Sequence, residues 1–162
     1  MKKIYSVLVE NRAGVLMKVA SLFSRRNFNI DSLAVGETDA HDVSCMTIVS
    51  SGEAHTIEQI EKQLNKKLDV IKVKTFDEAE AVDRELMLVK VKYNKSNRRD
   101  IMENCEICGA EIVDLSKTMM LIQICSTPEK VEQFLQMLKG ISIVEVARTG
   151  TIALQKCREN ER

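Results

Sequence analysis

The first half of the chain alternates between apolar runs typical of strands and apolar positions at helical spacing. Strands are predicted over residues 4–9, 29–36, 43–50 and 70–73. Two helices are predicted between them, each with one apolar face: Val15, Val19, Leu22 and Phe23 in the first, and Ile57, Ile60 and Leu64 in the second. The pattern therefore predicts the order β-α-β-β-α-β.

The second half repeats this order after an acidic connector, which we expect to be a solvated linker at residues 77–83. The predicted strands cover residues 86–93, 111–115, 119–125 and 143–146, and the predicted helices begin at Arg98 and Pro128. Residues 150–162 end in a charged sequence, so we expect a frayed tail there. Two units of the same order indicate an internal duplication of architecture.

Each unit is predicted to form an antiparallel four-stranded sheet with both helices on one face. This is the ferredoxin-like, or split βαβ, arrangement, and it belongs to the α+β class. The arrangement leaves the other face of each sheet uncovered. A partner sheet or the edge strand of a partner chain would cover it, so we expect a homodimer with a ligand site between its protomers.

The turn between the first strand and the first helix carries the most specific chemistry. Gly14 precedes the helix, and because it has no Cβ a ligand can approach the backbone closely. The first N–H groups of a helix have no partner within the helix, and they bind a carboxylate well. Asn11 lies in the same turn, and Asn29 lies in the turn that ends the helix. These residues predict a site for a small amino acid and a regulatory role.

Each of these residues also has a simpler structural explanation. Gly14 alone would suit a tight turn from strand to helix. Asn11 would suit the N-cap of the helix, and Asn29 would suit a turn position with left-handed backbone. The ligand site is favoured because all three residues occur together, in the spacing that a known family has.

Composition argues against several other functions. The 162 residues include 24 Lys and Arg and 24 Asp and Glu, so the formal net charge is zero. This argues against a nucleic-acid partner and against a polybasic membrane surface. No apolar run reaches the roughly 20 residues of a membrane span, and the N-terminus lacks the features of a signal peptide. We therefore expect a cytoplasmic protein.

The five cysteines do not suggest a disulfide framework, because their number is odd and their spacing irregular. Cys105 and Cys108 have CxxC spacing, but they end a predicted helix, whereas a redox motif of this kind begins one. No second CxxC completes a zinc site. We expect two half-buried thiols on one helix face and no metal site.

Residues 9–16 and 29–33 resemble the ACT domain, a small amino-acid-sensing module, in the version found in the regulatory small subunit of acetolactate synthase. Further stretches match the same family in the same order along nearly the whole chain: 46–48, 59–66, 86–90 and 143–150. The resemblance implies an amino-acid-sensing and dimerising ACT domain at residues 1–76. It implies a second ferredoxin-like domain at 84–149 that couples to the catalytic subunit.

The resemblance also implies a subunit with no catalytic residues of its own. Such a subunit binds the large catalytic subunit of acetolactate synthase, raises its activity and confers feedback inhibition by a branched-chain amino acid, usually valine. Thiamine diphosphate, Mg²⁺ and FAD are expected only in that partner. This chain has neither a glycine-rich dinucleotide motif nor a P-loop, so no cofactor is expected in it.

The family's site implies that the ligand carboxylate meets the start of the first helix. The backbone N–H groups of Gly14, Val15 and Leu16 would receive it, and Asn11 would add a polar contact. Ala13 stands where relatives commonly have serine or another small polar residue. We therefore expect affinity or selectivity to differ from theirs.

The remainder of the implied site comes from the neighbouring protomer. Asn29 and Ile30 of that protomer would receive the α-amino group through an amide oxygen or a backbone carbonyl. Leu16, Ile30 and Val35 are candidates for an apolar wall around an aliphatic side chain. Such a wall separates valine from leucine or isoleucine only weakly, because one methylene is worth about 1–3 kcal/mol.

Two other functions are weighed beside the regulatory subunit. One is a free-standing ACT-type sensor with a different partner. The other is a small ferredoxin-like enzyme such as an acylphosphatase, whose first loop needs several glycines and an arginine to hold phosphate. Here that loop has one glycine, and Arg12 has no further cradle residues beside it. The corresponding turn of the second unit, residues 94–98, lacks glycine and is a poorer amino-acid site.

Overall fold

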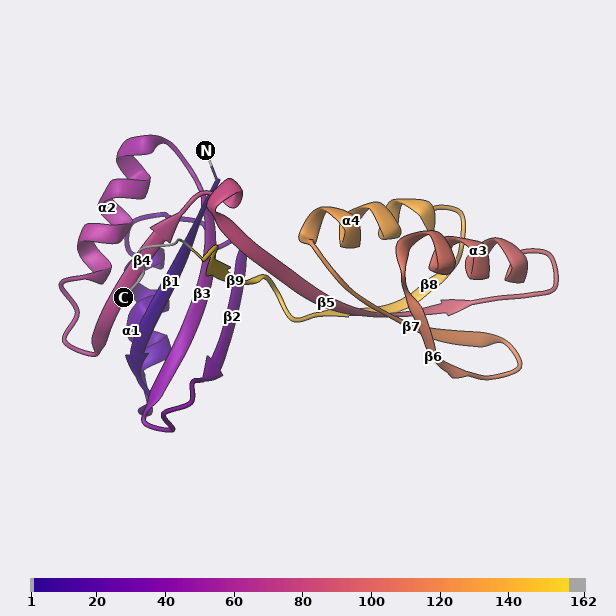
Figure 1. Cartoon of the computed structure of the whole chain (residues 1–162), viewed down its shortest axis with the longest axis horizontal. Coiled ribbons are helices and arrows are strands. Elements are labelled where there is room, and N and C mark those ends of the chain that lie inside the picture. The colour runs from indigo at the N-terminus through magenta and orange to yellow at the C-terminus, as the bar shows by residue number, and fades with distance from the viewer. Residues whose placement is uncertain (1, 158–162) are drawn as a thin grey trace. The chain divides into compact units, whose positions relative to one another are not determined.

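The computed structural model describes residues 2–157, except for the side chain of Glu78. Within this range the chain divides into two compact units. The first contains the residues up to Asp83 and those from Thr151 onward, and the second runs from Arg84 to Gly150. Figure 1 shows that each unit has a sheet with its own pair of helices.

The first unit contains an antiparallel sheet in the order β2-β3-β1-β4, with α1 and α2 on one face (Figure 1). Its elements are β1 (Lys2–Glu10), α1 (Val15–Ser24), β2 (Ser32–Glu37), β3 (Val43–Ser51), α2 (Ala54–Leu64) and β4 (Val70–Phe76). The inward-facing residues of β1 alternate with outward ones, as the period of a strand requires. Tyr5, Val7 and Val9 pack against Val19 and Phe23 of α1 in the core of this unit.

The second unit repeats the arrangement with the strand order β6-β7-β5-β8 and the helices α3 and α4. Its elements are β5 (Ala81–Lys92), α3 (Arg98–Cys108), β6 (Glu111–Leu115), β7 (Met119–Ser126), α4 (Pro128–Met137) and β8 (Ile143–Arg148). Thr127 caps α4, because its hydroxyl accepts the Lys130 N–H at 3.4 Å and proline follows at the first helical position. The predicted α+β class with two βαββαβ units is confirmed.

The prediction of a frayed tail from residue 150 is wrong for residues 152–155. Ile152–Gln155 form β9, which pairs with β5. Ala153 is buried in a small cluster with Ile4, Val49, Phe76 and Ala81, on the sheet face of the first unit that faces away from its helices. The chain therefore covers part of a face that we expected to be open. Residues 158–162 of the predicted tail lie outside the described residues.

Two predicted boundaries also differ from the structure. The expected linker at 77–83 contains a 3-10 turn at Glu78–Glu80, and β5 already begins at Ala81. The strand predicted from residue 29 begins only at Ser32. Asn27 has left-handed backbone (φ 54°), so the left-handed conformation weighed for Asn29 falls two residues earlier.

The strands at the ends of the orders β2-β3-β1-β4 and β6-β7-β5-β8 are β2, β4, β6 and β8, and three of these four are irregular. One extra residue interrupts the pairing of each irregular strand with its neighbour: Ile71 in β4, Val113 in β6 and Val144 in β8. By contrast, β2 pairs with β3 in unbroken register from Ser32 to Glu37. Bulges discourage an edge strand from pairing with another chain, so β2 is the edge best suited to such pairing.

Candidate effector-binding site

Gly14 is the N-cap of α1 and has left-handed backbone, with φ 85° and ψ −9°. A residue with a Cβ is strained in this conformation, and this accounts for glycine here. Space is not the reason, because a Cβ at this position would meet no atom within 4 Å. The turn is therefore open above Gly14.

Three amide hydrogens at the start of α1 lack a protein acceptor within residues 2–157. They are the N–H groups of Gly14, Leu16 and Met17, whereas the N–H of Val15 donates to the Arg12 carbonyl at 3.3 Å. The positive end of the helix dipole lies at the same place. The structure thus offers free donors where the sequence predicted a carboxylate site, although Val15 has a partner of its own.

Asn11 holds the Gly14 turn against the loop between β2 and β3. Its backbone N–H donates to the Asp42 carbonyl at 2.7 Å. Its side-chain amide donates to Glu37 Oε1 at 3.1 Å and to the His41 carbonyl at 2.8 Å. Both amide hydrogens of the side chain are therefore engaged, and the amide oxygen is the atom left to meet a ligand. Asn11 is not the N-cap.

Asn29 and Ile30 lie beyond the other end of α1. The Asn29 side chain donates to Asp31 Oδ1 at 2.6 Å, and the backbone carbonyl of Asn29 accepts the Ser50 hydroxyl at 2.6 Å. Ile30 is half-buried and packs against the core of its own unit. A helix of ten residues is about 15 Å long. Within one chain, Asn29 and Ile30 therefore lie about the length of α1 away from Gly14. The predicted site is incomplete in a single protomer.

The predicted apolar wall is exposed in part. The side chains of Leu16 and Val35 are 44% and 46% exposed. Val35 pairs with Met46, which pairs with Val7, so its side chain lies on the helix side of the sheet at the β2 edge. The side chain of Val15 is buried in the core, so it does not belong to the exposed wall, and Ala13 is exposed on the turn.

Charged residues that the sequence prediction missed surround the Gly14 turn. Lys18 Nζ lies 2.7 Å from Asp69 Oδ2, and Arg12 Nη2 lies 3.2 Å from Asp69 Oδ1. Arg12 also forms an ion pair with Glu10. The hydrogen bond from Lys18 is the main reason why the pKa of Asp69 lies below its usual value. Asp69 precedes β4, and no local pattern in the sequence indicates its contact with α1.

A groove beside Gly14 runs between α1 and α2, lined by Gly14, Met17, Lys18, Ser21, Leu22, Arg25, Arg26, Gln63 and Lys67. None of Asn11, Asn29, Ile30 or Val35 lines it. The groove therefore shares only Gly14 with the predicted site. It is more basic than that site, because its lining includes Lys18, Arg25, Arg26 and Lys67.

The turn before α3 in the second unit is filled by its own side chain. Asn94 Oδ1 accepts the N–H groups of Ser96 at 2.9 Å and Asn97 at 3.1 Å. These are amide hydrogens that a bound carboxylate would need. The second unit therefore lacks the glycine of the Gly14 turn, and the N–H of Asn97, which corresponds to that of Gly14, already has an acceptor.

The two thiols of the CxxC stretch lie at the end of α3, as predicted. Burial raises the pKa of Cys105 to about 11, and burial also raises the pKa of Cys108. Thiols of this kind stay protonated at neutral pH and are poor nucleophiles. Within residues 2–157 no group of three or more His, Cys, Asp or Glu side chains is placed to hold a metal ion. No helix in this range is long and apolar enough to cross a membrane.

The fold and the Gly14 turn define a class of regulatory protein with an ACT domain. Residues 5–72 match the family model described as AHAS small subunit-like ACT domain. Residues 84–157 match the model described as small subunit of acetolactate synthase.

Relatives with matching length agree with these two models. The acetolactate synthase small subunit of Mycolicibacterium smegmatis is 46% identical over 151 residues, covering 93% of this chain and 89% of that protein. The isozyme 3 small subunit of Escherichia coli is 40% identical, covering 96% of each chain. The crystal structure of the small subunit from Thermotoga maritima superposes with a TM-score of 0.91 at 38% identity, over 98% of this chain. The chain belongs to the small, regulatory subunits of acetolactate synthase, the non-catalytic partners of the large catalytic subunit.

Proposed function

We propose that this chain raises the activity of the large catalytic subunit of acetolactate synthase and makes it sensitive to a branched-chain amino acid, with valine expected. The observation that carries the proposal is the open Gly14 turn, where free N–H groups at the start of α1 can receive a carboxylate. Thiamine diphosphate, Mg²⁺ and FAD would belong to the large subunit. We expect the complex to work in the cytoplasm.

The proposed sensing unit is a homodimer formed through β2. Two β2 strands paired antiparallel about a two-fold axis would extend the sheet of the first unit into the partner's sheet. The unbroken register of β2 supports this edge over the three bulged ones. The exposed Val35 lies on the edge that such pairing would bury.

This pairing would complete the amino-acid site. The Glu37 end of β2 is bonded to Asn11 and so lies beside the Gly14 turn, whereas the Ser32 end follows Asn29 and Ile30. Antiparallel pairing sets the Glu37 end of one chain beside the Ser32 end of the other. The Gly14 turn of one protomer would then face Asn29 and Ile30 of the second copy, which one chain alone keeps apart.

Each part of an amino acid would find a matching group in this site. The carboxylate would meet the free N–H groups of Gly14 and Leu16, and the α-amino group would meet carbonyl oxygens at Asn29 or Ile30 of the second copy. The aliphatic side chain would lie against Leu16 and Val35. The second unit, whose corresponding turn is filled by Asn94, would pass the bound state to the large subunit.

The bound amino acid would act by favouring one arrangement of the dimer. A ligand shifts such an equilibrium only by its difference in affinity for the two states, and couplings of about 1–3 kcal/mol are typical. That range corresponds to roughly a 5- to 150-fold change in an equilibrium constant. It is large enough for feedback control without any catalytic residue in this chain.

Reconstitution tests the proposal. The purified chain is added to the large subunit of the same organism, acetolactate formation is measured, and valine, leucine and isoleucine are titrated separately. We expect the chain to raise the activity and to make it fall on addition of at least one of the three amino acids, with valine the most effective. Activity that is unchanged by the chain would contradict the regulatory role. A raised activity that ignores all three amino acids would contradict the proposed effector.

A further inference from the structure

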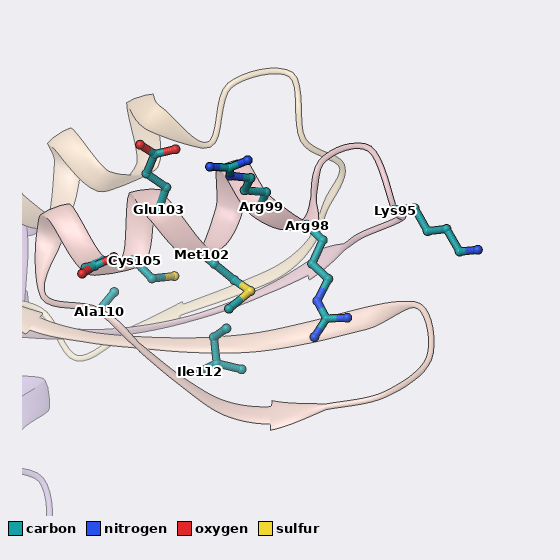
Figure 2. Close-up of a pocket in the computed structure, with 9 residues that line it drawn as sticks. Lys95, Arg98, Arg99, Met102, Glu103, Cys105, Ala110 and Ile112 are labelled. Atoms are coloured by element: carbon teal, nitrogen blue, oxygen red, sulfur yellow. The ribbon is translucent and has the colours of Figure 1, made fainter.

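A groove in the second unit lies between α3 and β6, and the proposed amino-acid site does not involve it. We call it the α3–β6 groove, and it is lined by Lys95, Arg98, Arg99, Met102, Glu103, Cys105, Glu106, Ala110 and Ile112. Figure 2 shows its two walls, with side chains from α3 above and Ile112 of β6 below. The groove has a volume of about 800 Å³, which is enough for several side chains of a peptide segment and much more than a small ion would fill.

The middle of the groove is apolar and exposed. Met102 and Ile112 point toward each other in Figure 2, and they are 47% and 37% exposed. Ala110 and the buried Cys105 continue the apolar surface toward the end of α3. Apolar side chains gathered in an open groove indicate a surface that a partner covers.

One end of the groove is basic. Lys95, Arg98 and Arg99 form no ion pair and no side-chain hydrogen bond within residues 2–157. Arg98 extends beside Met102 and Ile112 in Figure 2. The two acidic residues that line the groove, Glu103 and Glu106, lie further along α3. Positive charge therefore gathers at the start of the helix.

The stability of α3 does not account for these cations. Positive side chains at a helix N-terminus oppose the helix dipole, and only Asp100 in the first turn favours it. The opposite holds for Arg25 and Arg26, which lie at the end of α1, where cations stabilise a helix. The N–H groups of Arg99 and Asp100 also lack a protein acceptor in the described part of the chain. Carboxylates from another molecule would satisfy both the cations and these donors.

We propose that the α3–β6 groove receives an acidic, extended segment of the large catalytic subunit. An apolar side chain of that segment lies between Met102 and Ile112, and its carboxylates lie beside Arg98. The bulge at Val113 opposes the addition of another strand to β6, so side chains rather than strand pairing hold the segment. A second copy of this chain would be expected to use a regular edge, as β2 provides. The inference rests on the proposed function for the identity of the partner.

Binding of the whole chain to the large subunit tests the proposal. Arg98→Glu and Met102→Asp are each expected to raise the dissociation constant at least tenfold. Lys139→Glu is the matched control, because Lys139 is exposed in the same unit and does not line the groove, and its effect is expected to stay within twofold. The binding of the unmodified chain should weaken as salt rises, and that of Arg98→Glu should weaken less. Thermal melting of each variant checks that it folds.

A photo-crosslinker at position 102 identifies the occupant without reversing any charge. We expect it to join the chain to an acidic segment of the large subunit, located by mass spectrometry. Equal binding by the chain and by folded Arg98→Glu and Met102→Asp would overturn the groove proposal and leave the proposed function standing. A crosslink to a second copy of this chain would also overturn it. Failure of the unmodified chain to bind the large subunit would overturn both.

Discussion

Gly14 has left-handed backbone and a free N–H group. Two substitutions at this position can therefore distinguish the effect of backbone strain from that of excluding the ligand. Gly14→Asp places a carboxylate where the carboxylate of the amino acid would bind, and the two negative charges repel each other. We expect the reconstituted enzyme to lose valine inhibition, with at least a tenfold higher half-inhibitory concentration and with basal activity retained. The measurement is a valine titration of acetolactate formation.

Gly14→Asn is the matched control. Asparagine tolerates left-handed backbone about as well as aspartate does, and it adds a side chain of the same size without a charge. Partial sensitivity to valine is therefore expected in this variant. If Gly14→Asp inhibits like the unmodified chain, the amino acid binds elsewhere, and the basic groove between α1 and α2 becomes the next place to examine.

The importance of Gly14 was visible in the sequence, but its charged surroundings were not. A glycine between an apolar strand and an amphipathic helix is a local signal, because three or four residues determine the turn. The contact of Lys18 with Asp69 joins residues 51 positions apart, and it depends on how the loop before β4 meets α1. Local patterns carry no information about such a contact. For the same reason the sequence did not reveal that both amide hydrogens of Asn11 are engaged.

At the scale of the elements, Tyr5 makes the packing of β1 against α2 sensitive to high pH. Its side chain is fully buried, and its hydroxyl donates to the Ile57 carbonyl at 3.4 Å. Burial, with a smaller contribution from Glu61, raises the pKa of Tyr5 from 10 to about 12. The folded state therefore keeps the proton after the unfolded state has lost it. The contribution of the protonated Tyr5 hydroxyl to the stability of the fold is complete below pH 10 and is lost as pH rises from 10 toward 12.

The expected loss for Tyr5 is about 1.4 kcal/mol of unfolding free energy between pH 9 and pH 11. Urea unfolding of the chain and of Tyr5→Phe at both pH values measures it. The phenylalanine variant lacks the titrating group. Between pH 9 and pH 11 its unfolding free energy is therefore expected to fall by about 1.4 kcal/mol less than that of the unmodified chain. Parallel pH profiles for the two proteins would show that Tyr5 titrates alike in the folded and unfolded states.

Helices were predicted from the sequence better than the ends of the strands. The predicted helix over 98–108 matches α3, because helical periodicity and the glycine that follows are local signals. The strand β9 was missed although Ile152 and Leu154 alternate with other residues. A four-residue strand is recognised only through its partner, and here the partner is β5, about 70 residues earlier. Its burial of Ala153 against Ile4 and Phe76 likewise depends on the folded sheet.

At the scale of the whole molecule, amino-acid sensing and dimerisation are predicted to depend on one strand. The Thr38 N–H donates to the Val43 carbonyl at 3.0 Å, so residues of β2 an even number of positions away point their N–H groups toward β3. The N–H of Val35 then points outward, toward the partner strand of the proposed dimer. Val35→Pro removes this donor and leaves the pairing of β2 with β3 intact, because proline is tolerated on the outer side of an edge strand.

We expect Val35→Pro to sediment as a monomer and to bind no valine in calorimetry, because the site would lose the half contributed by the second copy. Val35→Ala keeps the outward N–H and removes only part of the apolar wall. It should sediment as a dimer and bind valine more weakly than the unmodified chain. These two variants separate the effect of the strand pairing from that of the side chain. A folded Val35→Pro that still binds valine as a monomer would show that one chain is sufficient for sensing, and the link between dimerisation and feedback would then be wrong.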